Sequence, residues 1–187
     1  MSDSIKKGIK LVAFAFLFTL VNLNLTINSV KINITPDFIG WILFTLAFDN
    51  LGEYAEDRKY LKYVSMVMIV LTGAQWILSI MNPDLEIGIL NTVTSIISAV
   101  YMFMLMESLI RIADDIGSVR ADTLRFLRWA NPAVTVAIGL VGLMFLNSQE
   151  VNTVNAVATI LVMVIGITVA IMTAVTLFRL YKDVRES

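Results

Sequence analysis

Three carboxylates lie within or beside segments that are otherwise apolar, namely Asp37, Asp49 and Glu107. An ionisable group inside a membrane is costly, so such residues are candidates for proton or cation coupling or for binding a polar solute. Each also has a structural explanation. Asp37 follows Pro36 and would lie in the first turn of a helix, where the dipole favours a carboxylate. Asp49 and Glu107 lie near cations that could pair with them: Arg58, Lys59, Lys62 and Arg111.

Four amides extend this candidate solute or ion path: Asn22, Gln75, Asn91 and Asn155. Further polar residues recur every three or four positions, among them Ser65, Thr72, Ser95, Asn131, Thr135 and Thr173. This spacing places each set on one face of a helix. In lipid, such a face either joins two helices by hydrogen bonds or lines a polar cavity, and the sequence leaves both readings open.

Other kinds of chemistry are limited by composition. The chain has no Cys and no His, which excludes disulfides, thiol or imidazole nucleophiles, and zinc, haem and copper sites of the usual kind. The neighbouring carboxylates Asp114 and Asp115 could hold Mg²⁺, but a solvated loop is the simpler reading. With no glycine-rich phosphate loop, we expect no cofactor and no enzymatic activity, although a carboxylate-based membrane enzyme stays open.

The overall composition indicates a membrane protein. Of 187 residues, 58% are hydrophobic and 16% charged, and the mean hydropathy is +0.81. A soluble domain has about 45–50% apolar and about 25% charged residues. With a net charge of −1, the chain is neither an ordinary soluble globule, nor disordered, nor a basic nucleic-acid binder. The lipid bilayer is therefore the expected partner.

Six segments are apolar enough to be read as membrane-crossing helices, given that about 20 such residues span a bilayer. They are Ile9–Ile27, Pro36–Leu51, Tyr63–Met81, Ile87–Met106, Trp129–Leu146 and Val151–Leu180. The connections between them are short. The sequence therefore predicts an all-α polytopic protein, with residues 1–187 forming a single domain of six transmembrane helices in three antiparallel hairpins.

The cations predict how this domain is oriented. If the N-terminus is cytoplasmic, only Lys31 falls outside. The inner side then holds Lys6, Lys7, Lys10, Arg58, Lys59, Lys62, Arg111, Arg120, Arg125, Arg128, Arg179, Lys182 and Arg185. Lys and Arg concentrate in cytoplasmic loops. We therefore expect a multi-pass protein of the cytoplasmic membrane with both termini in the cytoplasm.

Glycine and proline mark the expected helix ends. Gly52 and Gly117 are read as the residues that close two helices at their inner ends. Pro36 is expected at the first position of a helix capped by Thr35. Pro132 would either restart or kink a helix. The inner stretch 111–128 mixes apolar and charged residues and is predicted to lie along the headgroups as an amphipathic segment.

One stretch carries a family resemblance. The segment Lys31-Ile32-Asn33-Ile34-Thr35-Pro36-Asp37-Phe38-Ile39-Gly40-Trp41-Ile42-Leu43 resembles a segment of small, largely uncharacterised membrane proteins of Gram-positive bacteria. The resemblance covers one loop and the start of one helix. It implies a bacterial cytoplasmic membrane and no particular activity.

These observations lead to two main hypotheses of function. The first is non-enzymatic binding or transport of a small solute or lipid, in which Asp49 or Glu107 takes part. The alternative is a structural, regulatory or immunity-type membrane subunit whose polar faces only join helices. Such a subunit would associate with another membrane protein or with copies of itself.

Overall fold

The computed structural model describes residues 3–20, 24–27, 30–33, 36–52, 54–55, 59–81, 88–147 and 153–186. These residues form six helices and one small antiparallel sheet. The helices are α1 (Asp3–Leu20), α2 (Asp37–Leu51), α3 (Lys59–Met81), α4 (Gly88–Asp115), α5 (Ala121–Asn147) and α6 (Thr153–Glu186). The strands are β1 (Asn24–Ile27) and β2 (Val30–Asn33). The expected predominantly helical fold is confirmed.

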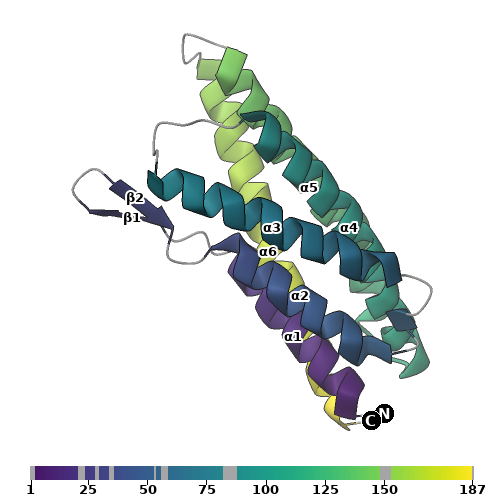
Figure 1. Ribbon diagram of the computed structural model, residues 1–187. Coiled ribbons are helices and arrows are strands. Elements are labelled where there is room, and N and C mark those ends of the chain that lie inside the picture. Colours follow the sequence, from purple (N-terminus) through teal and green to yellow (C-terminus); the bar gives the residue numbers. More distant parts are fainter. Residues whose placement is uncertain are drawn as a thin grey trace.

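The helices run back and forth between two ends of the molecule (Figure 1). One end holds both chain ends, the junction of α2 with α3 and the turn from α4 to α5. We call it the basic end, because α1, α3, α5 and α6 carry most of their Lys and Arg residues there. β1 and β2 lie beside the C-terminal end of α3, at what we call the hairpin end, and α5 and α6 extend beyond them (Figure 1).

Three helices are long and apolar enough to cross a membrane, within the part of the chain that the structure describes. They cover Lys59–Met81, Leu90–Asp115 and Val157–Arg185. Large apolar side chains are exposed along them, including Val70, Ile96 and Ile167. Such surfaces are stable in lipid rather than in water. The chain is therefore a membrane protein with transmembrane helices.

The first predicted helix is too long at its outer end. We expected it to reach Ile27, but α1 ends at Leu20 and Asn24–Ile27 is strand β1. Asn24 pairs with Asn33 and Ile27 with Val30 in an antiparallel hairpin. Apolar residues alternate with polar ones in both strands, a pattern that favours a strand over a helix.

α2 packs closely against α1. A Cβ atom added at Gly40 would lie 2.6 Å from Cγ2 of Thr19 and 3.0 Å from the carbonyl oxygen of Ala15. Gly8 makes a similar approach to Leu51 from the α1 side. Glycines at both points let the two backbones come together, as small residues do between membrane helices.

Both glycines expected to close helices have a positive φ, 60° at Gly52 and 63° at Gly117, which side chains other than glycine rarely adopt. At the end of α4, the N–H of Ser118 donates to the carbonyl of Ala113 (2.8 Å) and the N–H of Gly117 to that of Asp114 (3.0 Å). This pair of bonds is the Schellman motif. α2 begins one residue later than expected, because Pro36 takes the N-cap position without a side-chain cap.

The amphipathic segment predicted for residues 111–128 is wrong. Residues up to Asp115 belong to α4, and Ala121 already starts α5. The Schellman turn reverses the chain within five residues, so several apolar side chains of this stretch pack between helices, although Val119 and Phe126 are exposed. Ile112, Leu124 and Leu127 are fully buried. Of the two interpretations of Pro132, a restart is wrong, since Pro132 lies inside one longer helix, α5.

An aromatic cluster forms the centre of the core, where α2 meets α4. The ring of Tyr101 lies 4.9 Å from that of Trp41, 5.4 Å from Phe44 and 6.2 Å from Phe48, measured between centroids. Tyr101 and Phe44 are fully buried. These tilted and edge-on contacts fix α2 against α4, and so position the last turn of α2 at the basic end.

Candidate functional site

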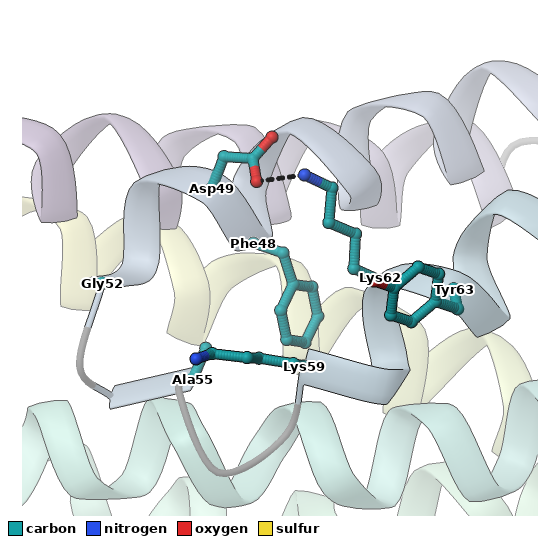
Figure 2. Close-up of a pocket in the computed structure, with 7 residues that line it drawn as sticks. All are labelled: Phe48, Asp49, Gly52, Ala55, Lys59, Lys62 and Tyr63. Carbon is teal, nitrogen blue, oxygen red and sulfur yellow. Dashed lines mark hydrogen bonds and ion pairs between the residues drawn. The ribbon is translucent and has the colours of Figure 1, made fainter.

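A pocket lies at the basic end, where α2 ends and α3 begins (Figure 2). Its volume is about 480 Å³, and its lining residues are Phe48, Asp49, Gly52, Ala55, Lys59, Lys62 and Tyr63. Gly52, with its positive φ, ends α2 and turns the chain toward α3. The lining side chains therefore come from the last turn of one helix and the first turns of its antiparallel neighbour.

Asp49 forms an ion pair across this pocket. Lys62 Nζ donates to its carboxylate oxygen at 2.5 Å, as Figure 2 shows. The aspartate side chain is 53% exposed and the lysine 35%, so water screens the pair. Lys62 was among the partners expected for Asp49, and this expectation is confirmed.

The pocket combines positive charge with an apolar wall. Its described lining contains two lysines and one aspartate, and Lys62 is paired with Asp49. The Lys59 side chain extends below the ring of Phe48 toward Ala55 (Figure 2). Ammonium groups bind phosphate or carboxylate oxygens as point charges, and a ring beside them suits the apolar part of a ligand.

Hydroxyl groups continue the α2–α3 contact one turn deeper. The hydroxyls of Thr45 and Ser65 are 2.8 Å apart, and Ser65 also donates to the carbonyl of Lys62. Ser65 is fully buried. The Tyr101 hydroxyl is buried as well and makes no hydrogen bond. This polar layer closes the pocket from the aromatic core and holds α3 in register with α2.

Glu107 belongs to a different part of the molecule. Arg128 of α5 donates to its carboxylate at 2.5 Å, and the guanidinium lies 5.1 Å from the ring centroid of Phe103 and 5.6 Å from that of Trp129. The expected partners of Glu107 did not include Arg128. The tight turn between α4 and α5 brings this arginine beside Glu107, and the pair links the two helices.

Gln75 and Asn91 are brought together. The side-chain amide of Gln75 donates to the amide oxygen of Asn91 at 2.9 Å, from α3 to α4. In the same way, Asn131 of α5 donates to the hydroxyl of Thr173 on α6 at 3.1 Å. Both contacts agree with the interpretation that the polar faces join neighbouring helices by hydrogen bonds.

Asp37 is the candidate carboxylate with the fewest stabilising contacts. Its Oδ1 atom is buried and has no hydrogen-bond partner among the described residues. The backbone N–H of Ile39 donates to the carbonyl of Pro36 instead. Asp37 does lie in the first turn of α2, as expected. Of the remaining candidates, Asn22 lies outside the described residues, as does the side chain of Asn155.

The neighbouring carboxylates Asp114 and Asp115 are each engaged by another side chain. Arg125 contacts Asp114 at 2.7 Å, and the Tyr54 hydroxyl donates to Asp115 at 2.6 Å. Within the described residues, no group of three acidic side chains is arranged to hold a metal ion. These contacts tie α4 to α5 and to the α2–α3 junction.

Sequence reasoning missed the pocket itself. Lys59 and Lys62 were considered only as partners of Asp49 and Glu107, while Phe48 and Tyr63 were not singled out. The available signal was a short helix ended by glycine and followed within ten residues by two lysines of the next helix. Comparison with protein-family models, curated proteins and solved structures finds no match to this chain.

Proposed function

We propose that this membrane protein crosses the bilayer six times with both termini in the cytoplasm. Three helices meet the length and hydropathy of a span, and both chain ends lie at the basic end of the molecule. The positive-inside rule then assigns the basic end to the cytoplasm, and β1 and β2 to the outer face.

At its basic end, in this proposal, the protein binds a small anionic group, a phosphate or a carboxylate, carried by a solute or a lipid. The observation that supports binding is the α2–α3 pocket, in which Lys59 and Lys62 flank Asp49 beside an aromatic ring. The role is one of binding rather than catalysis, because the other paired carboxylates serve contacts between helices.

Opposite effects of two substitutions test this proposal. Lys62→Gln removes a cation, whereas Asp49→Asn removes the competing anion and releases Lys62. We expect Lys62→Gln to weaken binding of inorganic phosphate and of glycerol 3-phosphate, and Asp49→Asn to strengthen it. An exposed charge contact contributes about 0.2–1 kcal/mol, so each change should be up to about fivefold.

Calorimetric titration of the purified protein at low ionic strength measures these affinities, because salt screens exposed charges. Lys7→Gln is the matched control, since Lys7 is an exposed lysine on α1, outside the pocket. Unchanged affinity in both Lys62→Gln and Asp49→Asn would refute anion binding in this pocket.

A structural or regulatory subunit is the second candidate. It is favoured by the cross-helix contacts, since Thr45–Ser65, Gln75–Asn91 and Asn131–Thr173 each join neighbouring helices. On this alternative, gentle purification would retain another membrane protein. No phosphate compound would alter the melting temperature.

A further inference from the structure

The helices α1 and α6 reach different depths in the membrane. The rings of Phe14 on α1 and Phe178 on α6 lie 5.7 Å apart and fix the level of one helix against the other. Large apolar side chains are exposed on α6 from this level as far as Val157, about 31 Å away at 1.5 Å per residue. That distance matches the roughly 30 Å hydrocarbon core of a bilayer. α1 continues from the same level only to Leu20, or about 9 Å, and therefore ends far below the outer boundary of the hydrocarbon.

α2 begins at a similar depth. Gly40 packs against the last turn of α1, and α2 starts only one turn further out, at Asp37. The ring of Phe38 lies 5.6 Å from that of Trp76 on α3, and α3 continues outward from Trp76 to Met81, or about 8 Å. The chain therefore leaves α1 and enters α2 at a level that α3 and α6 cross as helices.

The strands β1 and β2 follow α1 at this level. They form a two-stranded sheet, so within the described residues each strand has one edge without a partner strand. The sheet contacts α3 through β2 and lies beside the C-terminal end of that helix (Figure 1). An open sheet edge is not stable against lipid, because hydrocarbon offers no partner for the backbone N–H and C=O groups. The edges of this sheet therefore require water or protein beside them.

The sheet and the start of α2 also carry polar side chains. Asn24 pairs with Asn33 and Thr26 with Lys31, so these four positions share one face of the sheet. The half-buried Asp37 follows, and its Oδ1 atom accepts no hydrogen bond from a described residue. Polar groups are costly in hydrocarbon and stable in water. The open edges, the polar face and the carboxylate thus all require water at this depth.

We infer that an aqueous vestibule opens on the outer face of the protein and descends beside the β1–β2 sheet to the start of α2. Small hydrophilic solutes enter it from outside and reach Asp37 at its inner end. This inference rests on the proposed orientation, in which β1 and β2 are on the outer side. It does not depend on the α2–α3 pocket, which lies at the basic end.

The reactivity of single cysteines tests the vestibule, because the chain has no native cysteine. Asp37→Cys places a thiol at its inner end. Val70→Cys is the matched control, since Val70 is 70% exposed on α3 and lies one turn from Gly73, which is level with Phe38. Intact cells are treated with the membrane-impermeant reagent trimethylammonioethyl methanethiosulfonate. We expect Asp37→Cys to react at least about tenfold faster, because a thiol in hydrocarbon does not ionise to the reactive thiolate.

A second pair of variants keeps the test decisive if Asp37→Cys does not fold. Thr26→Cys places a thiol on β1, and Ile77→Cys places one in the outer half of α3, at a position that is 53% exposed. We expect the same contrast, with Thr26→Cys the faster. Labelling after denaturation gives the total thiol, and elution as a single species in detergent identifies the folded variants.

Equal rates for folded Asp37→Cys and Val70→Cys would overturn the inference and leave the proposed orientation and anion binding standing. If only the second pair can be measured, equal rates for Thr26→Cys and Ile77→Cys would overturn it in the same way. Reaction of Asp37→Cys only after the membrane is opened would refute the proposed orientation together with the outward vestibule.

Discussion

Asp37 differs from the other candidate carboxylates in having a buried oxygen without a partner. Asp49 and Glu107 each accept a bond from a cation, Lys62 and Arg128 respectively. An unsatisfied polar group in an apolar environment costs free energy, and the cost is greater for a charge. We therefore expect Asp37 to lower the stability of the fold.

Asp37→Asn should consequently raise the melting temperature of the purified protein. The amide retains the size of the side chain and removes the charge. A gain of about 1 kcal/mol corresponds to roughly 2–4 °C in a chain of this length. Asp49→Asn is the control, and its melting temperature should hardly change because that ion pair is exposed. A lower melting temperature for Asp37→Asn would mean that the carboxylate has a stabilising partner.

The Glu107–Arg128 pair should behave in the opposite way. Its side chains are only 30% and 26% exposed, and Arg128 Nε is buried without a hydrogen bond. Glu107→Gln leaves a partly buried guanidinium without its counter-charge, so we expect a loss of about 1–3 kcal/mol. Glu107→Gln/Arg128→Gln should recover part of it. Thermal unfolding of the wild type, Glu107→Gln, Arg128→Gln and the double variant forms a double-mutant cycle, and strict additivity would show that the pair contributes nothing.

The contacts of these residues also differ in how far they could be predicted from the sequence. Asp49 and Lys62 could be associated because they flank one short connection between two helices. Glu107 and Arg128 are 21 positions apart, and their contact depends on the exact turn between α4 and α5. The environment of Asp37 depends on how α2 packs, which no local pattern contains.

At the scale of elements, the contact between α1 and α2 depends on Gly40. Gly40→Ala places a methyl group 2.6 Å from Thr19 Cγ2 and 3.0 Å from a backbone oxygen of α1. Because the backbone cannot move aside readily, we expect a loss of about 1–3 kcal/mol, measured by thermal or denaturant unfolding in detergent.

Gly73→Ala is the matched control for that substitution, since Gly73 is also helical but has open space around it. Alanine has the higher helix propensity, so this variant should be neutral or more stable by up to about 1 kcal/mol. Equal losses in both variants would contradict the close approach of α1 and α2.

The ends of α2 and α4 were predictable, because Gly52 and Gly117 act locally through their positive φ, whereas the first residues of α1, α3 and α5 lie four or more positions before the predicted ones. The hairpin was not predicted, although Val30–Ile34 alternates apolar and polar residues, a period-two signal. The strong apolar run preceding it was extended too far as a helix. The sequence did not predict that α4 and α5 extend into residues 111–128. A mixed apolar and charged stretch is also typical of a segment that lies on a membrane surface.

At the scale of the whole molecule, the lack of native cysteine makes the proposed orientation directly testable. Val119→Cys places one thiol in the exposed turn at the basic end, and Lys31→Cys places one on β2. A membrane-impermeant maleimide added to intact cells should label Lys31→Cys only. Val119→Cys should react only after the membrane is opened. Labelling of both thiols in intact cells would refute the orientation.

The helical membrane fold could be predicted from the sequence, because hydropathy and charge asymmetry are properties summed over many residues. The pocket was not, since it arises where two helices meet and depends on the angle between them. Its lysines looked like ordinary inner-face cations until the fold placed an aromatic ring and an exposed apolar face beside them.

The 15 residues of α2 relate this protein to the thickness of its membrane. A helix of this length covers about 22 Å, some 8 Å less than a typical hydrocarbon core. Lipids around a crossing α2 must therefore compress or tilt, at a cost of fractions of a kcal/mol for each ångström. Shorter-chained bilayers relieve that cost, so the protein should accumulate in the thinner regions of a mixed membrane.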